Sequence, residues 1–245
     1  MQSLENFKRI NASELRSFLT GLILGDGTID IGTNKRSFRI KSINHDFINY
    51  IEYVIKNNTC FRYYINEFPE MIDKYNVRHQ KYWQFVIISH PYFNKLYHYF
   101  YDDYRHRTIY TKMLNWLTPI GLANWYMSDG YICLVGKNTG NIYNRRLDIC
   151  TDRYKLEDIQ KIQNFLQDKF GIKTSINKRG KFYRIRICME SYETFITLIQ
   201  PYIVPSMLYK LYLGYNNKQK WMSDDFWNFQ EYLKSAVTLP SNVGG

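Results

Sequence analysis

The sequence predicts a mixed α/β (α+β) protein of two similar halves, each in the order helix, two strands, helix, two strands, helix. Three observations support this. An apolar stretch that stops at an Asp-Gly pair occurs twice, as FLTGLILGDG at 18–27 and LANWYMSDG at 122–130. The same succession of helical and alternating apolar patterns follows each copy. A basic residue also lies 81 positions after the acid of each copy, Arg107 in the first and Lys210 in the second.

Each apolar stretch predicts a buried helix. We expect the first helix to begin near Ser13, a candidate N-cap, and to run to Asp26, and the second to end at Asp129. A glycine follows each acid, and glycine accepts the left-handed conformation found just past a last helical turn.

Small residues indicate how these helices pack. Gly21 and Gly25 are four positions apart, so they share one helix face, and a face without side chains lets another backbone approach closely. Asn124 and Ser128 stand at the matching positions of the second copy.

Alternating or β-branched segments predict the strands, and 3.6-residue apolar spacing predicts the other helices. Arg39 and Lys41 share one face of their strand, opposite Phe38 and Ile40. The first half is expected to hold strands at 28–31, 37–42, 61–65 and 82–88 and helices at 46–56 and 91–101. The second half is expected to hold strands at 131–135, 146–150, 174–177 and 182–188 and helices at 156–170 and 192–199.

The repeat also divides the chain into segments. We expect an N-terminal arm at 1–11, a first half at 12–101, a linker at 102–118, a second half at 119–213 and an aromatic-rich C-terminal extension at 214–245.

Composition restricts the partners and the compartment. The 245 residues carry a formal net charge of +11, which favours polyanions. The four cysteines lack C-x-x-C pairing, which indicates reduced thiols and no zinc site. No secretory signal or membrane-length apolar run is present. We therefore expect an intracellular protein without a membrane partner, made in a mitochondrion from an organellar gene or in a phage-infected cell.

The position of the two acids indicates a metal site. A carboxylate at a helix C-terminus faces the negative end of the helix dipole, and two packed helices would bring Asp26 and Asp129 close enough to repel. A divalent cation between them would offset both costs. The last helical carbonyls, such as those of Gly25 and Ser128, lack intrahelical partners and would add oxygen ligands.

The two apolar motifs and their surroundings resemble those of a known protein family. The chain resembles a single-chain, double-motif LAGLIDADG homing endonuclease of the intron-encoded mitochondrial branch. The nine-letter motif maps onto LTGLILGDG at 19–27 and LANWYMSDG at 122–130, and PIGLANWYMSDG and PYIVPSMLYKL are especially similar to that branch. The resemblance covers most of 12–213. Leu24 and Met127 depart from it, because they replace the acid often found two places before the catalytic one.

The resemblance implies two αββαββα halves related by a pseudo-twofold axis, with the motif helices at their interface. Each half contributes a curved antiparallel sheet, and the two sheets form a saddle over double-stranded DNA. The chain would act as a monomer and cut both strands of a long, nearly non-palindromic site with Mg²⁺ or Mn²⁺, bound as two or three ions.

The chemistry of the residues agrees with this activity. Phosphodiester hydrolysis needs a water nucleophile and stabilisation of charge on the phosphate and leaving oxygens, and metals held by Asp26 and Asp129 supply these. Arg107 and Lys210 would lie beside the two scissile phosphates. We assign Arg107 an electrostatic role, because an arginine does not readily serve as a base, and leave Lys210 either role.

DNA recognition is expected from the sheets, since a two-stranded ribbon fits the major groove. Most of the basic residues on predicted strands should contact phosphate and not base edges. The candidate DNA-binding residues are Lys35, Arg36, Arg39, Lys41, Arg145, Arg146, Asp148, Lys178, Arg179, Lys181, Arg184 and Arg186.

Two other functions remain open at this stage. An RNA maturase would hold its own intron RNA in the same basic saddle, and the two acids would then be relics. A catalytically inactive DNA-binding regulator is the second alternative, and the presence of both acids and both matched cations argues against it.

Overall fold

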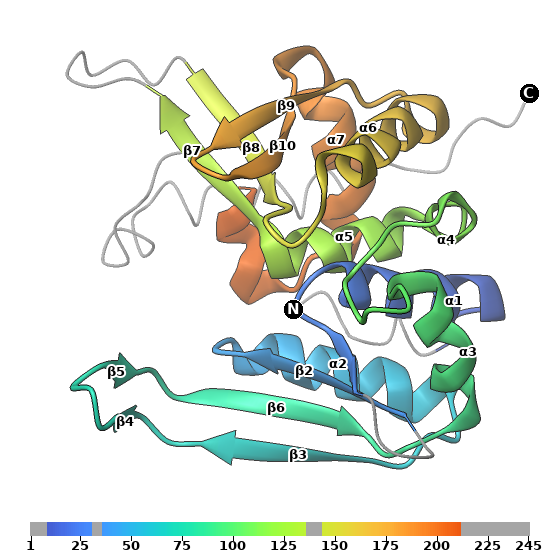
Figure 1. Cartoon of the computed structure of the whole chain (residues 1–245), viewed down its shortest axis with the longest axis vertical. Helices are drawn as coiled ribbons and strands as arrows, with labels where there is room; N and C mark the ends of the chain where they lie inside the picture. The colour runs from blue at the N-terminus through green and yellow to red at the C-terminus, as the bar shows by residue number, and fades with distance from the viewer. Residues whose placement is uncertain (1–8, 31–35, 136–143, 212–245) are drawn as a thin grey trace, which may run out of the picture.

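The two halves lie one above the other in the computed structural model, which describes residues 9–30, 36–135 and 144–211. Helices α1 (Ala12–Leu24) and α5 (Pro119–Asp129) run between the halves and pack against each other (Figure 1). One hydrophobic core extends through both halves, from Phe18 on α1 to Trp125 on α5 and on to Leu211. No helix in the described part of the chain is long and apolar enough to cross a membrane.

The first half builds one four-stranded sheet, called sheet 1, in the order β1-β2-β6-β3 with antiparallel neighbours. Helix α2 packs on strands β2 and β6 of this sheet. Its elements are β1 (Thr28–Asp30), β2 (Ser37–Ser42), α2 (His45–Asn58), β3 (Tyr63–Phe68), β6 (Tyr82–Ile87) and α3 (Pro91–Phe100).

The second half repeats this topology as sheet 2, in the order β7-β8-β10-β9 and again antiparallel. Helix α6 packs on β9 and β10. Its elements are β7 (Gly130–Val135), β8 (Asn144–Cys150), α6 (Leu156–Phe170), β9 (Thr174–Arg179), β10 (Phe182–Ile187) and α7 (Tyr192–Ile199), followed by 3-10 turns at Gln200–Tyr202 and Pro205–Lys210. The predicted order of elements is therefore confirmed in both halves.

Glycine lets the motif helices touch backbone to backbone. A Cβ on Gly21 would lie 1.9 Å from the carbonyl oxygen of Gly121, and one on Gly25 would lie 2.4 Å from the Cβ of Ser128. The expected close approach is confirmed, although Gly121 and not Asn124 faces Gly21. At the other end of this contact the Ser17 hydroxyl accepts from the backbone N–H of Thr118 (2.7 Å).

Helix α5 ends at Asp129 as predicted, but both ends of α1 differ from the prediction. Asn11, not Ser13, is the N-cap of α1: its side chain accepts from the backbone of Ser13 and Glu14, and the Glu14 carboxylate accepts from the backbone of Asn11. The helix ends at Leu24, before the acid. The glycine after each acid is not left-handed, since Gly171 and Gly180 are the positive-φ glycines of the described residues. Gly27 and Gly130, the glycines that follow the acids, instead avoid clashes. A Cβ on Gly130, for example, would meet the Tyr126 ring.

The structure also contains elements that the sequence analysis missed. Between β3 and β6, residues 69–81 form an extension hairpin with strands β4 (Met71–Ile72) and β5 (Arg78–His79), which projects beyond the sheet (Figure 1). Its turn is built by Asp73, whose Oδ1 accepts from the backbone N–H groups of Tyr75 and Val77. A short helix, α4 (Thr111–Leu114), lies between the halves. The N-terminal arm before residue 9 and the C-terminal extension lie outside the described residues.

Candidate active site

The two acids follow the ends of the packed motif helices. Asp26 comes two residues after α1 and its side chain is 42% exposed, while Asp129 is the last residue of α5 and is partly buried. Burial, reinforced by the negative charge of Asp26, raises the pKa of Asp129 to about 7. The positive charges of Arg153, Arg107 and Lys210 act in the opposite direction. The carboxylates therefore form an interacting pair surrounded by three cations from both halves.

Arg107 binds the C-terminal end of α1. Its Nη1 donates to the carbonyls of Ile23 (2.5 Å) and Gly25 (3.1 Å), and its Nη2 donates to the carbonyl of Gly27 (2.5 Å) and the hydroxyl of Thr28 (3.3 Å). A guanidinium suits this position because several carbonyls there lack helical partners and carry the negative end of the dipole.

Lys210 does the same at the end of α5. Its Nζ donates to the carbonyl of Met127 and, at 3.2 Å, to that of Ser128. Burial lowers the pKa of the Lys210 ammonium to about 8, against the opposing influence of Asp26 and Asp129. The 81-residue spacing thus places one cation at each helix end, beside the acid, where it contacts carbonyl oxygens in this structure.

A third cation, Arg153, was missed by the sequence analysis. It lies in the loop between β8 and α6, and its guanidinium contacts the carbonyl of Gly25 (3.3 Å) and a carboxylate oxygen of Asp26 (3.5 Å). The next residue, Tyr154, donates its hydroxyl proton to the carbonyl of Leu24 (3.0 Å). The second half therefore reaches across to the acid of the first. The repeat spacing gave no sign of this Arg153 contact. The equivalent loop of the first half, between β2 and α2, spans only residues 43–44 and is too short to hold a counterpart of Arg153.

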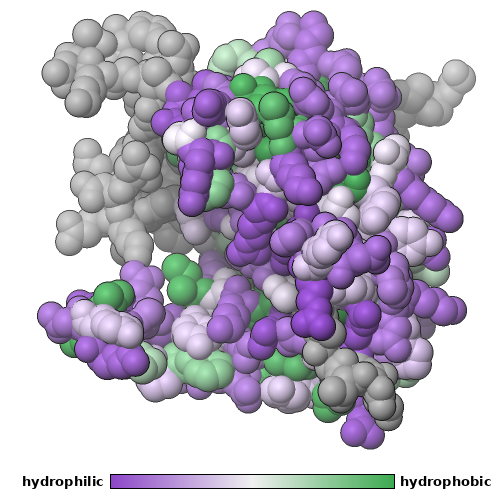
Figure 2. Space-filling model, in the orientation of Figure 1, coloured by the Kyte–Doolittle hydropathy of each residue, from purple (hydrophilic) through white to green (hydrophobic). Residues whose placement is uncertain are grey.

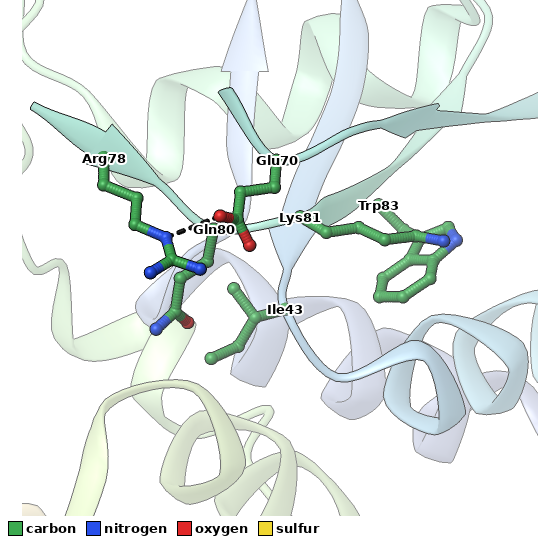
Figure 3. A pocket seen from close by; sticks show the side chains of 6 residues that line it. All are labelled: Ile43, Glu70, Arg78, Gln80, Lys81 and Trp83. Carbon is green, nitrogen blue, oxygen red and sulfur yellow. Dashed lines mark hydrogen bonds and ion pairs between the residues drawn. The ribbon is translucent and has the colours of Figure 1, made fainter. Parts of the chain in front are cut away.

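A groove of about 820 Å³ opens beside Asp26 and connects it to the outer face of sheet 1, the face opposite its helices. Its walls include Asp26, Ser128, Arg153, Lys210, Arg39 and Lys41. A second hollow of about 530 Å³ lies under the extension hairpin, and in its wall Arg78 pairs with Glu70 at 2.5 Å (Figure 3). The groove, not this hollow, is lined by two of the four expected catalytic residues, Asp26 and Lys210.

The groups at the helix ends fit a hard divalent cation. The described residues contain no cluster of three or more His, Cys, Asp or Glu side chains that could hold a metal. Asp26 and Asp129 therefore need carbonyl, water or phosphate oxygens as further ligands, which is the ligand type Mg²⁺ prefers. The predicted carbonyls of Gly25 and Ser128 lie at these helix ends, where they accept from Arg107, Arg153 and Lys210.

Sheet 2 confirms the expected alternation and corrects one residue. Ile185 and Ile187 are buried toward the helices, whereas Arg184 and Arg186 lie on the outer face and are about a quarter exposed. Asp148, expected to contact DNA, is only 1% exposed, because Arg186 and Arg146 cover its carboxylate. A buried carboxylate in this position cannot contact a base edge.

The strand register separates the remaining candidates of sheet 2. Arg179 is paired with Phe182 and Lys178 with Tyr183, so Lys178 lies on the helix side of the ribbon and Arg179 on the outer side. Lys181 is exposed at the turn. Arg145 belongs to β8, but its side chain lies outside the described residues.

Sheet 1 places its candidates in three environments. Arg39 and Lys41 are exposed on the outer face, as expected. Arg36 instead lies over the Tyr97 ring at 3.3 Å with its Nη1 buried, an environment that does not suit a phosphate contact. Lys35 lies outside the described residues. The outer face also carries exposed polar residues that were not predicted, Arg62, Tyr64 and Asn66, on or just before β3.

Comparison with known proteins decides the family. The LAGLIDADG DNA endonuclease family model matches residues 16–195. The chain belongs to the LAGLIDADG DNA endonuclease family. It is 30% identical over 197 residues to a probable intron-encoded endonuclease of Wickerhamomyces canadensis, a match that covers 79% of this chain and 81% of that protein.

Two further matches extend the LAGLIDADG assignment. The solved structure of the homing endonuclease I-WcaI bound to its DNA recognition sequence superimposes with a TM-score of 0.71 at 26% identity, covering 86% of this chain and 92% of that one. A cytochrome b mRNA maturase of Saccharomyces cerevisiae is 36% identical over 100 residues, covering 40% of this chain and 21% of the maturase. The chain is therefore similar both to proteins named for cutting DNA and to one named as an mRNA maturase.

Proposed function

We propose that this chain is a site-specific homing endonuclease that hydrolyses both strands of a long DNA target. The observation that carries the proposal is the meeting of Asp26 and Asp129 at the ends of two packed helices, inside a ring of Arg107, Arg153 and Lys210. Two carboxylates so placed would hold Mg²⁺ or Mn²⁺ with the carbonyls of Gly25 and Ser128, and we propose two or three ions. Such ions supply a nucleophilic water and neutralise phosphate charge.

The protein's own side chains would orient the DNA and stabilise the negative charge that develops during cleavage. Arg107 and Lys210 hold the helix ends rigid and add positive charge beside the acids, where negative charge develops on the scissile phosphates. Arg153 adds a third cation, which contacts Asp26 and also acts electrostatically on Asp129. Arg39, Lys41, Arg179, Arg184 and Arg186 on the outer faces would contact the DNA, and the pseudo-twofold repeat would bring one acid to each strand.

Cleavage of the DNA around the insertion site of the host intron tests this function. Asp26→Asn and Asp129→Asn are expected to lose double-strand cleavage with Mg²⁺ by at least about a thousandfold, while filter binding of the target stays within about threefold. Asp103→Asn removes an exposed acid elsewhere and serves as the matched control. Unchanged cleavage by both active-site variants contradicts the assignment.

The maturase relative supports a second candidate function, assistance of intron splicing. Intron RNA is polyanionic and would suit the same basic faces. A splicing assay with the two Asn variants separates the activities, because RNA folding on a surface does not require both carboxylates. Splicing retained by variants that no longer cut DNA would establish a maturase. The intron-encoded relatives also lead us to propose an organellar gene as the source of this chain.

A further inference from the structure

A buried acid lies beneath the arginines of sheet 2. The Asp148 carboxylate accepts from Arg186 Nε at 2.9 Å and from the Tyr131 hydroxyl at 3.1 Å, and Arg146 Nε lies 3.5 Å away. Burying a charge is costly unless partners compensate it. Here the partners are the outer-face side chains themselves, so the acid and the arginines hold one another in place.

The network continues along β10. Arg184 Nη1 donates to the Tyr131 hydroxyl (3.1 Å), and its Nε and Nη2 bind the two carboxylate oxygens of Asp152 at 3.0 and 2.9 Å. A bidentate arginine–carboxylate pair has a defined plane as well as charge. Arg184 is thus held by Asp152 and Tyr131, and Arg186 by Asp148, while 27% and 24% of the two arginine side chains stay accessible.

Sheet 1 has no comparable network among the described residues of its outer face. Arg39 pairs with Asp30 at 2.7 Å, but these side chains are 46% and 30% exposed. Lys41 is exposed above the Tyr82 ring, 5.1 Å from its centre. An exposed ion pair holds side chains weakly, and a lysine can move its point charge from one acceptor to another.

We propose that Asp148 is a positioning residue that fixes Arg186 directly, and Arg184 through the Tyr131 hydroxyl, before DNA binds. The half of the DNA target under these two arginines of sheet 2 would then be read strictly, and the half under sheet 1 permissively. The proposal rests on the proposed endonuclease function. A fixed guanidinium loses little side-chain entropy on binding the correct base, and it cannot move to a new partner when the base is wrong. A mobile Lys41 or Arg39 can turn to a phosphate instead.

The test is the cleavage rate on a panel of targets, each with one base pair changed. For the wild-type chain, changes at the positions read by sheet 2 should slow cleavage by about 5- to 100-fold, the effect of one lost bidentate contact, and those read by sheet 1 by less than about threefold. Asp148→Asn should reduce the penalties at the positions read by Arg186 to below about threefold. It should lower those at the positions read by Arg184 only in part, because Asp152 still holds that side chain, and leave those of the other half-site unchanged. Asp30→Asn is the matched control, and it should leave the sheet 2 penalties as they are.

Tyr131→Phe provides a second, milder variant. It removes the hydroxyl that joins Asp148 to Arg184 but keeps the Arg186 pair, so we expect partial loss of the same penalties. Equal tolerance of both half-sites in the wild type would overturn the proposal. So would Asp148→Asn slowing every target by one common factor, which is the result of a damaged fold. A wild-type chain that cuts no target at all would overturn the endonuclease function instead.

Discussion

Arg107 and Lys210, 103 positions apart, make equivalent contacts at the two motif helices. Arg107 donates to the carbonyl of Gly25 at 3.1 Å, and Lys210 donates to the carbonyl of Ser128 at 3.2 Å. Gly25 and Ser128 are themselves 103 positions apart and directly precede the two acids. The duplication has thus preserved a cation that closes the helix end, while the residue type has diverged from lysine to arginine or the reverse.

Removing the Arg107 clamp should destabilise the protein. Arg107→Ala leaves the carbonyls of Ile23, Gly25 and Gly27 without this donor, and we expect a loss of about 3 kcal/mol in the free energy of unfolding, since hydrogen bonds to a charged group are each worth about 1.5–3 kcal/mol. Urea denaturation without metal measures this. Lys112→Ala, at an exposed position, is the control, and equal stability of the two variants would show that the clamp contributes nothing.

The raised pKa of Asp129 makes stability depend on pH. An aspartate in an unfolded chain titrates near 3.9, whereas Asp129 in the folded protein titrates near 7. Between these values the folded state binds the extra proton, so the stability of the metal-free protein should fall as pH rises from about 4 to 7, by up to about 1.4 kcal/mol per pH unit.

Asp129→Asn should remove that decline. Urea midpoints at pH 5 and pH 8 are expected to differ less in Asp129→Asn than in the wild type, with the variant the more stable at pH 8. Mg²⁺ should raise the wild-type midpoint at pH 8 and have little effect on the variant. Asp103→Asn should behave as the wild type does. A wild type and an Asp129→Asn variant with parallel pH profiles would refute this account of the carboxylate pair.

A methyl group at Gly21 should separate the halves. Because its Cβ would lie 1.9 Å from the Gly121 carbonyl oxygen, the two backbones must move apart, and we expect Gly21→Ala to cost more than about 3 kcal/mol, above the usual range for overpacking. Ser13→Ala, at an exposed position of the same helix, should cost little. The comparison is made by urea denaturation, and a Gly21→Ala protein of wild-type stability would mean that the helices do not meet here.

The two candidate N-caps of α1 can be told apart. Asn11→Ala removes the acceptor for the backbone N–H groups of Ser13 and Glu14 and should lower stability by about 1 kcal/mol. Ser13→Ala should be neutral or slightly stabilising, because Ser13 lies inside the helix and alanine is the better helix former. Urea midpoints in the opposite order would restore Ser13 as the cap.

Local sequence patterns predicted many of the helices and strands correctly. Helix α6 was predicted over the residues it occupies, and Gly171 after it is left-handed, with φ of +67°, as a glycine at a helix end often is. Strand β2 was likewise predicted from its alternation, which puts Arg39 and Lys41 on one face. Residues 69–81 were missed because the extension hairpin follows no period-2 pattern and depends on the Asp73 turn. The segment boundaries at 1–11, 102–118 and 214–245 stay predictions.

The sequence by itself determined the duplication, the order of elements, the pair of acids and the cation that follows each by 81 positions, because these are properties of periodicity and spacing along the chain. Only the tertiary structure decided that Arg153 reaches Asp26 from 127 positions away, that Asp148 is buried, and that Arg36 lies against Tyr97. A charged residue has the same pattern in a sequence whether it ends beside a carboxylate, under an arginine or over an aromatic ring. Its partner is selected when distant segments pack, and packing depends on the whole chain at once.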